Sequence, residues 1–296
     1  MVNLVVDLGQ SGSRIKIDNE VINLTIAKNS EEEVLSTVEK IFKEVPSRSF
    51  TSVFLSLTGL QGNVEDPKPF GELCANYFQA KEVCIMDDGI ASYLGALKDY
   101  DGVVLTLGGG VVAISCNDSK FGHADGKGPI FGDFGGGFWI GQSALRRAIA
   151  TLDGRDHAES LVKLLGSELE EYRLLNNTTG IAASALCIKA AKTVTSGAES
   201  GNVDAAKVLE EGSMRLAETI FAAWAKVKTS DNQIPKVAIQ GGLSKSNFYV
   251  EQICQKLQNF MQFERIEGSG DNLIGATLVA TKYQSDLNPL MKWWRA

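Results

Sequence analysis

The chain has 296 residues, a length that fits one large or two ordinary domains. With 44% hydrophobic and 22% charged residues, it has the composition of a soluble globular protein with a sizeable core. A net charge of −7 argues against nucleic acid or an anionic membrane as the main partner. It does not argue against nucleotides, because backbone N–H groups bind phosphates without a basic surface.

Cysteine usage and the N-terminal sequence predict a cytoplasmic protein. The five cysteines are scattered and no pair has metal-ligand spacing, so we expect no zinc site, iron–sulfur cluster or disulfide. The chain opens on a strand-like segment, which is not the pattern of a signal peptide. Its apolar runs are too short for a membrane span, so we expect no membrane partner.

The first hundred residues alternate strand-like and helix-like segments. A buried strand at 4–7 leads into a turn at 9–13 and a returning strand at 14–18, which predicts a hairpin. A helix is expected from a capping box of Ser30 and Glu33 onward. The other segments expected here are strands at 21–27, 52–57 and 82–87, and helices after Pro69 and at 90–97.

The pattern then restarts, which suggests an internal duplication. Residues 103–108 echo residues 4–9, and a turn at Gly108–Gly110 leads into a returning strand at 111–116. The later segments expected are a mainly helical region at 138–228, strands at 236–239 and 262–266, and helices at 245–261 and 271–282. The tail with Trp293 and Trp294 is expected to pack on the body. Each half would be a mixed sheet flanked by helices, with a ligand cleft between the halves.

A glycine-rich stretch at 126–141 organises the second half. Seven of its sixteen residues are glycine, and Asp133 is the charge expected to face inwards. Glycine clusters mark required backbone conformations or close backbone approach. Because a helix follows from Phe138, free N–H groups at its start could face a ligand. The two interpretations are a ligand-binding loop with Asp133 facing the ligand, which we favour, and a tight turn between domains.

Together these segments offer the parts of a phosphoryl transferase. The turn Gly9–Ser13 (Gly9, Gln10, Ser11, Gly12, Ser13) and the turn at Gly108, Gly109 and Gly110 could both direct N–H groups at phosphates. Asp7 could hold Mg²⁺, directly or through water. Gly241 and Gly242, between a strand and a helix, suit the nucleoside end. A plain hairpin is as good an interpretation of any one of these turns; three of them in this order favour the phosphate site.

The acceptor side of the reaction needs a base and hydrogen-bonding groups. Asp88 follows an apolar strand and begins a helix, where a carboxylate could accept a hydroxyl proton. Either Asp87 or Asp88 could be the helix cap, with the other as the base, and the sequence leaves this choice open. Thr58 and Gly59 follow another strand end, and Asp133 could bind sugar hydroxyls. The chain has no P-loop motif and no dinucleotide fingerprint in a strand-to-helix context.

These motifs resemble those of the BadF/BadG/BcrA/BcrD ATPase family, within the actin-like sugar kinase superfamily, and in particular its N-acetylglucosamine kinases. The segment 7–14 is similar to the family's first phosphate motif, and Asp88-Gly89-Ile90-Ala91 to the segment that carries its catalytic base. Gly132-Asp133-Phe134-Gly135-Gly136 is similar to its Gly-Asp-Glu-Gly-Ser. Gly241-Gly242 resembles its adenosine motif, and Gly275-Ala276 the Gly-Ala of its last helix.

The resemblance implies an α/β fold of two actin-like, ribonuclease H-like lobes with nucleotide and sugar in the cleft between them. We place the lobes at 1–100 and 101–296, with the option that the last helix packs back on the first. The implied activity is transfer of the ATP γ-phosphate to the 6-hydroxyl of an amino sugar, with Mg²⁺. Asp88 would be the base, Asp7 the metal ligand, and Thr58, Gly59, Gly128 and Asp133 the sugar-binding residues; a homodimer is possible.

One motif departs from the family and keeps a second function class open. The family's second phosphate motif is Gly-Thr-Gly-Ser, whereas this chain has Gly108-Gly109-Gly110-Val111 and lacks both hydroxyls. A lost hydrogen bond to a charged group is worth about 1.5–3 kcal/mol. The favoured function is an N-acetylglucosamine kinase, and a glucosamine kinase is an alternative within the same chemistry. The alternative of another class is a sugar- or nucleotide-binding regulatory protein of the same fold.

Overall fold

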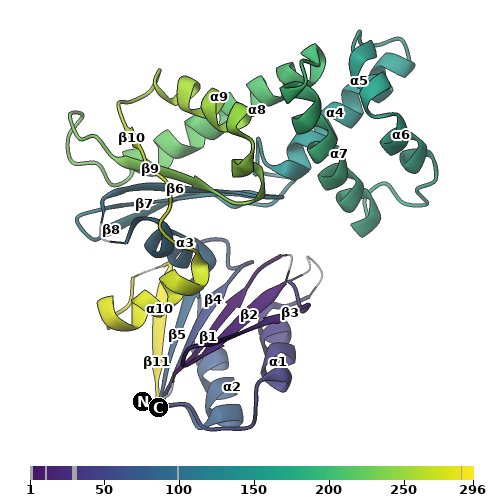
Figure 1. The fold of residues 1–296 in the computed structure, drawn as a ribbon. Helices are drawn as coiled ribbons and strands as arrows, with labels where there is room; N and C mark the ends of the chain where they lie inside the picture. Colours follow the sequence, from purple (N-terminus) through teal and green to yellow (C-terminus); the bar gives the residue numbers. More distant parts are fainter. Residues whose placement is uncertain (1–2, 11, 29–31, 99, 288) are drawn as a thin grey trace. The chain divides into compact units, whose positions relative to one another are not determined.

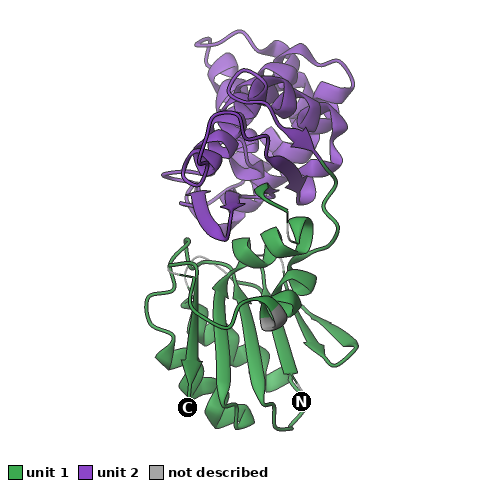
Figure 2. Ribbon diagram, turned by 90° about the vertical axis from the view of Figure 1, so that its left-hand side faces the viewer, with its two compact units in different colours: residues 1–104, 266–296 green, residues 105–265 purple. Residues whose placement is uncertain are grey.

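The computed structural model describes residues 3–10, 12–28, 32–98, 100–287 and 289–296. The chain divides into two compact units: Met1–Val104 with Ile266–Ala296 form unit 1, and Leu105–Arg265 form unit 2 (Figure 2). Residues 266–296, which the sequence-based division assigns to the second lobe, lie in unit 1.

Unit 1 contains a six-stranded mixed sheet (Figure 1). Its strand order is β11-β5-β4-β1-β2-β3. The strands are β1 (Asn3–Leu8), β2 (Ser13–Ile17), β3 (Glu20–Leu24), β4 (Ser52–Leu57), β5 (Glu82–Asp87) and β11 (Met291–Arg295). The strands β1, β4 and β5 are parallel neighbours, whereas β2, β3 and β11 join antiparallel. The expected hairpin at 4–18 is confirmed.

Side-chain alternation gives the two faces of this sheet different roles. Leu4, Val6 and Leu8 of β1 belong to a buried cluster that also contains residues of α1 (Val34–Glu44) and α2 (Lys68–Phe78). Successive strand residues point to opposite faces, so Asp7 points away from these helices. Asp7 is thereby kept out of the main apolar core.

Two further helices of unit 1 pack closely on each other. They are α3 (Asp88–Leu97) and α10 (Asn272–Lys282). A Cβ atom on Gly95 would collide with the Asp271 carbonyl, and one on Gly275 with the Ala91 carbonyl. Glycine at both positions therefore allows the two backbones to touch. This contact fixes the start of α10 beside α3.

Unit 2 contains a five-stranded mixed sheet with the order β10-β9-β6-β7-β8. The strands are β6 (Gly102–Leu107, which begins in unit 1), β7 (Val111–Asn117), β8 (Lys120–Asp125), β9 (Lys236–Gln240) and β10 (Glu264–Arg265). The helices are α4 (Gly137–Leu152), α5 (Glu159–Leu164), α6 (Gly166–Arg173), α7 (Ile181–Glu199), α8 (Val203–Ala225), η1 (Gly242–Lys245) and α9 (Asn247–Leu257). Mixed sheets flanked by helices confirm the predicted fold class.

Some boundaries differ from the sequence-based expectations. Ser30 lies outside the described residues, and Glu33 occupies the N-cap of α1 without a side-chain capping bond. The tail is the strand β11, which pairs antiparallel with β5 and places Trp294 against Gly71 of α2. The hairpin partner β8 was not expected from the sequence. Both of these strands are edge or near-edge elements with polar, mixed patterns that give a weak strand signal.

Candidate functional site

The carboxyl ends of three parallel strands bring the polar candidates of unit 1 together. The register pairs Asp7 of β1 with Ser56 of β4, and Leu57 of β4 with Asp87 of β5. Thr58 and Asp88 follow directly on β4 and β5. Open α/β sheets bind ligands at this edge. We call Asp7, Thr58, Asp87 and Asp88 the carboxylate cluster.

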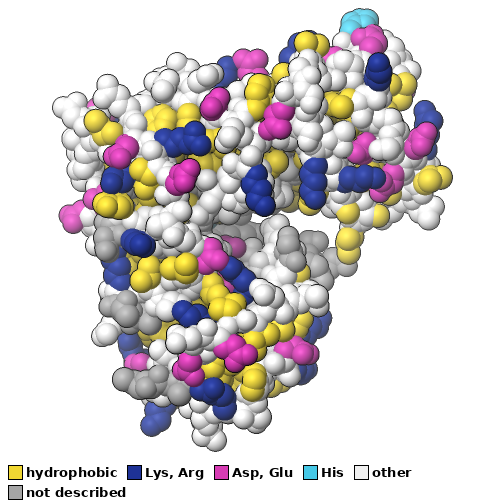
Figure 3. Space-filling model, in the orientation of Figure 1, with side chains coloured by type: hydrophobic (Ala, Val, Ile, Leu, Met, Phe, Trp, Pro, Cys, Tyr) yellow, Lys and Arg dark blue, Asp and Glu magenta, His cyan; other side chains and the backbone are white. Residues whose placement is uncertain are grey.

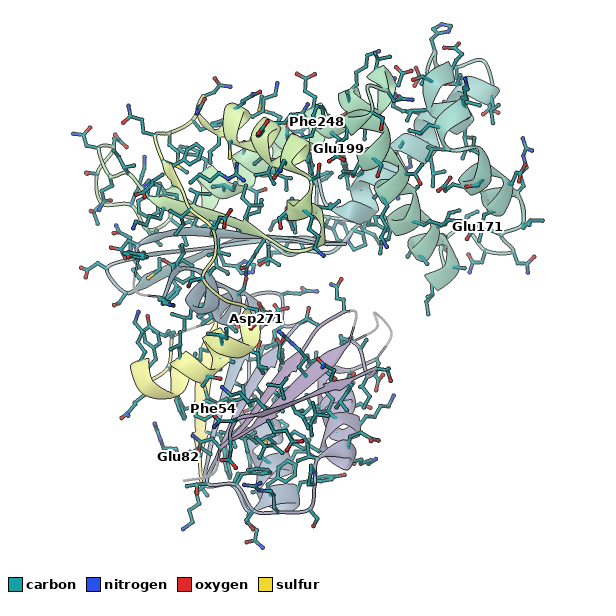
Figure 4. All side chains as sticks on the ribbon, in the orientation of Figure 1. Phe54, Glu82, Glu171, Glu199, Phe248 and Asp271 are labelled. Carbon is teal, nitrogen blue, oxygen red and sulfur yellow. The ribbon has the colours of Figure 1, made fainter. Side chains whose placement is uncertain are left out.

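Asp7 is buried and both of its oxygens have partners. The Ser56 hydroxyl donates to Asp7 Oδ1 at 3.1 Å. The Arg14 guanidinium donates to Asp7 Oδ2 from Nε at 3.2 Å and from Nη2 at 2.6 Å. Arg14 lies directly opposite Asp7 in the β1–β2 pairing, and its Nη1 also pairs with Asp271 at the start of α10 (Figure 4). Asp7 therefore belongs to a three-residue ionic network.

The structure distinguishes the two neighbouring aspartates after β5. Asp87 is the N-cap of α3: its Oδ1 accepts from the Gly89 amide at 3.0 Å and its Oδ2 from the Gly62 amide at 2.9 Å. With both oxygens bound to backbone, Asp87 has a structural role. Asp88 is the first residue of α3, which leaves it as the candidate base.

Asp88 is held in a state that favours its protonated form. Burial, followed by the negative charges of Asp87 and Asp7, raises the pKa of Asp88 far above that of an ordinary aspartate. Hydrogen bonds from the Thr58 hydroxyl and the Gly89 amide act in the opposite direction. A carboxyl group with a raised pKa is a stronger proton acceptor once it is ionised.

The first turn is closed by its own backbone. The Gly9 amide donates to the Gly12 carbonyl at 2.9 Å, and the Gly9 carbonyl accepts from the Lys28 amide at 3.0 Å. Gly12 has a φ of +154°, and the Ser13 hydroxyl is buried with no hydrogen-bond partner among the described residues. Gln10 is exposed. Ser11, a predicted phosphate ligand, lies outside the described residues.

Gly59, a predicted sugar-binding residue, begins the loop after β4. It has a φ of +89°, and it follows Thr58, whose amide donates to the Leu8 carbonyl at 3.0 Å. The loop after β4 is thus tied to the end of β1. This places Gly59 next in the chain to the carboxylate cluster.

In unit 2 the second glycine turn is tied to the start of α4. The Gly108 amide donates to the Gly110 carbonyl at 3.0 Å. The Gly108 carbonyl accepts from the Gly137 amide at 2.8 Å, and the Gly109 carbonyl from the Phe138 amide at 2.9 Å. These first amides of α4 were expected to face a ligand; instead they brace the turn. Backbone bonds therefore hold the turn against the start of α4, without the hydroxyls of the related motif.

Asp133 is buried against this turn. Its φ is +59°, a left-handed conformation that aspartate tolerates better than most residues, and its amide donates to Asp125 Oδ1 at 2.8 Å. Burial, followed by the charge of Asp125, raises the pKa of Asp133 to about 6, against hydrogen bonds from the Val111 and Gly128 amides. A Cβ atom on Gly110 would lie 2.5 Å from Asp133 Oδ2.

One oxygen of Asp133 has an unused capacity to accept a hydrogen bond. Oδ1 is buried and has no hydrogen-bond partner among the described residues. A buried acceptor without a hydrogen bond raises the free energy of the fold, so a hydrogen bond from a ligand hydroxyl to this oxygen would be favourable. Gly128, the other predicted sugar-binding residue of this loop, has a φ of +79° and open space where a Cβ would lie.

Gly241 and Gly242 lie at the end of β9, beside the same turn. Gly241 has a φ of +112°, and a Cβ there would collide with the carbonyl of Leu107, the residue before Gly108. Gly242 begins the short helix η1 and has open space around it. Unit 2 therefore gathers Gly108–Gly110, Gly128, Asp133, Gly241 and Gly242, which we call the glycine cluster.

The residues around Asp7 fit a magnesium ion that is bound mainly by water and phosphate. Within the described ranges no group of three or more His, Cys, Asp or Glu residues could hold a metal ion. Mg²⁺ commonly uses one or two carboxylates and completes its shell with water and substrate phosphates. Asp7, with one carboxylate at a strand end, suits that mode and does not suit a site made by protein ligands alone.

Three residues with clear roles were missed or left without a role in the sequence-based reading. Arg14 could have been found, because hairpin alternation places it opposite Asp7. Asp125 ends β8, an unexpected strand, and Asp271 lies 257 residues from Arg14, so no local pattern indicates either contact.

One face of the molecule is mixed in charge. On the face shown in Figure 3, Lys and Arg side chains lie among Asp and Glu side chains. This distribution agrees with the modest net charge of −7. Among the described residues, no helix is both long enough and apolar enough to cross a membrane.

Comparison with known proteins gives the family. Residues 10–280 match the model of the BadF/BadG/BcrA/BcrD ATPase family. A curated relative, the N-acetylmuramic acid/N-acetylglucosamine kinase of Clostridium acetobutylicum, is 21% identical over 209 residues, or 67% of each chain. The match extends over most of the chain, so this protein belongs to the BadF/BadG/BcrA/BcrD ATPase family.

Solved structures show the same fold. A candidate N-acetylglucosamine kinase from Chromobacterium violaceum is 22% identical, with a TM-score of 0.65 over 94% of this chain and 98% of that one. A ROK family glucokinase from Streptomyces griseus, in complex with glucose and AMPPNP, is 15% identical, with a TM-score of 0.60 over 94% and 99%. The chain thus has the α/β fold of these two solved structures.

Proposed function

We propose that this protein is an ATP-dependent kinase that phosphorylates the 6-hydroxyl of an amino sugar, with N-acetylglucosamine as the favoured acceptor. The observation that carries the proposal is Asp88: a half-buried carboxyl at the carboxyl end of a parallel strand, close enough to Asp7 to feel its charge, with the neighbouring Asp87 committed to the helix cap. Family membership and the kinase relative from Clostridium acetobutylicum support this reading.

In the proposed reaction Asp88 takes the proton of the acceptor hydroxyl. The hydroxyl oxygen attacks the γ-phosphorus of ATP, and the bond from that phosphorus to the ADP oxygen breaks. Thr58 hydrogen bonds to Asp88 and holds its carboxyl group in place. Asp7 would hold Mg²⁺, which when bound neutralises charge on the transferred phosphate.

The glycine cluster and the first turn have binding roles in this proposal. Asp133 Oδ1, buried and unpaired, would accept a hydrogen bond from a sugar hydroxyl. Gly59 and Gly128, both with positive φ, would let the backbone approach the sugar. The amides of Gly9–Ser13 and of Gly108–Gly110, other than those of Gly9 and Gly108, which bond within their own turns, would bind phosphates. Gly241 and Gly242 would lie along the nucleoside.

The test is ADP release from ATP and Mg²⁺ with one sugar at a time. N-acetylglucosamine, glucosamine, N-acetylmannosamine and glucose are offered in turn, and the phosphorylated position of any product is read by NMR. We expect sugar-dependent turnover with N-acetylglucosamine that is lost in Asp88→Asn. Preference for glucosamine would keep the kinase and change the acceptor. ADP release at the same rate with and without sugar, or full turnover in Asp88→Asn, would contradict the proposal.

One observation favours the regulatory alternative. The second turn lacks both hydroxyls of the related motif, and two of its carbonyls already accept from α4 amides. A binding protein would retain nucleotide or sugar affinity without turnover. Calorimetric titration with ATP and N-acetylglucosamine, run beside the turnover assay, separates the two functions.

A further inference from the structure

Arg14 competes for the oxygen that a cation would use on Asp7. Two guanidinium nitrogens contact Asp7 Oδ2, and Ser56 occupies Oδ1. A guanidinium keeps its charge at any working pH, so deprotonation cannot remove it. A divalent cation can bind Oδ2 directly only if Arg14 gives up those contacts.

Asp271 provides a second anchor for the same guanidinium. Its Oδ2 pairs with Arg14 Nη1, while its Oδ1 accepts from the Ile274 amide at 3.2 Å and caps α10. The close packing of α10 on α3 fixes this carboxylate in place. Side-chain exposure rises from 10% for Asp7 to 31% for Arg14 and 51% for Asp271, so the network runs from the buried strand end towards solvent.

We propose that Arg14 and Asp271 are a positioning pair that sets the affinity of Asp7 for a divalent cation, an inference that rests on the proposed function. Arg14 occupies Asp7 Oδ2 while the cation is absent. When the cation takes that oxygen, Asp271 keeps the guanidinium at the edge of the site. Neither residue needs to touch the cation.

The charge balance explains why both members are needed. Without Arg14, Asp7 would face the nearby Asp88 carboxyl and would lose its ion-pair partner among the described residues. Without Asp271, Arg14 would have Asp7 as its sole carboxylate partner among those described, and the cation would compete against a fully committed guanidinium. Arg14 thus neutralises Asp7, and Asp271 makes that neutralisation reversible.

The experiment is a double-mutant cycle on Mn²⁺ binding to the full chain without nucleotide, followed by electron paramagnetic resonance. We expect Arg14→Gln to bind Mn²⁺ roughly three- to tenfold more tightly and Asp271→Asn roughly threefold more weakly, the range of a partly exposed charge pair. In the Arg14→Gln background the Asp271→Asn effect should fall below about twofold, because it acts through Arg14.

Two controls make the cycle specific. Asp271→Asn keeps a good N-cap for α10, and Asp66→Asn removes a charge from another capping-type contact of unit 1, the one with the Lys68 amide. Asp66→Asn should leave the Mn²⁺ affinity unchanged. Asp7→Asn should abolish Mn²⁺ binding at this site. Thermal melting of each variant confirms folding.

The inference fails on any of three results. These are unchanged Mn²⁺ binding in Asp7→Asn, weaker binding in Arg14→Gln, and an equal Asp271→Asn effect with and without Arg14. The last would show that Asp271 acts by its charge alone. The proposed function fails separately, through absence of sugar-dependent ADP release in a protein whose Mn²⁺ cycle behaves as expected.

Discussion

The hairpin of β1 and β2 and the hairpin of β6 and β7 begin alike and differ at their turns. In unit 1 the next-to-last residue of β1 is Asp7, which is held by Ser56 and Arg14. At the equivalent position of unit 2 the echoing sequence has Thr106, and the turn that follows is held by bonds from the backbone of α4.

The difference indicates a division of labour between two similar frameworks. The carboxylate cluster concentrates titratable groups at strand ends, where small changes in charge alter chemistry. In the glycine cluster, backbone segments lie close to one another, so that adding a single methyl group would change the shape of the site. Substitutions in unit 1 should therefore change rates and cation affinity, whereas substitutions in unit 2 should first change stability and ligand fit.

The largest expected effect is on Asp88. Asp88→Asn should lower kcat on the order of 10²–10⁴-fold, because the acceptor proton loses its base. Its melting temperature should not fall, because burial already disfavours the charged form. Asp87→Asn is the matched control: it replaces one of two oxygens that accept backbone amides, so it should lower the melting temperature. If Asp87→Asn lost turnover at full stability, the assignment of base and cap would be reversed.

The ionisation of Asp88 also gives a pH dependence with a definite sign. Its pKa is raised, and the base works in the ionised form, so kcat/KM should rise with pH through the neutral range. The measurement is the pH profile of sugar-dependent ADP release at saturating Mg²⁺. A profile that falls over this range would mean that the group observed acts as an acid.

The next effect is at Gly110. A Cβ there would lie 2.5 Å from Asp133 Oδ2, so Gly110→Ala should lower stability by about 1–3 kcal/mol through overpacking. Gly108→Ala is the control for stability, since no atom lies within 4 Å of its Cβ position, and it should cost less than about 1 kcal/mol. Urea denaturation of both variants measures the difference. Equal costs would mean that the turn and Asp133 are not coupled by this contact.

Asp133 should show the opposite sign in stability. The pKa of Asp133 is raised from 3.8 to about 6. Below pH 3.8 the group is protonated in both the folded and the unfolded chain and its ionisation does not affect stability. As pH rises from 3.8 to about 6 the fold loses stability, and above that range the full loss remains. Asp133→Asn should therefore be more stable than the parent at pH 8 by about 2 kcal/mol, with the gain vanishing near pH 4. A gain independent of pH, measured by denaturation at both values, would rule out ionisation as its cause.

The smallest effect is expected at Tyr249. Its buried hydroxyl donates to the Gly135 carbonyl at 2.8 Å and ties α9 to the glycine-rich loop. Tyr249→Phe should cost about 1 kcal/mol in the free energy of unfolding. If Tyr249→Phe weakened the free energy of sugar binding by more than it lowered the free energy of unfolding, this bond would shape the loop for ligand binding.

Much of the fold could be predicted from the sequence because its signals are local. The apolar runs of β1, β4 and β5 and the glycine turns after β1 and β6 identified both hairpins and the strand ends. The roles of Asp87 and Asp88 remained open, because the deciding bond comes from Gly62, 25 residues away.

The rest depends on contacts between distant segments. The tie from Arg14 to Asp271, the strand β11 and the bracing of Gly108 by Gly137 join residues that no periodicity relates. The glycine-rich stretch shows this most clearly, because its composition indicated a special backbone and could not indicate that α4 amides would point at the second turn.

The strand β11 also has a consequence for the order in which the protein is made. It covers the edge of β5, and the Leu290 carbonyl accepts from the Asp87 amide at the start of α3. Residues 266–296 leave the ribosome only after the whole of unit 2. During translation β5 is therefore an uncovered sheet edge, the state in which strands are most prone to pair with other chains. Unit 2 is a continuous segment and can fold first; unit 1 closes last.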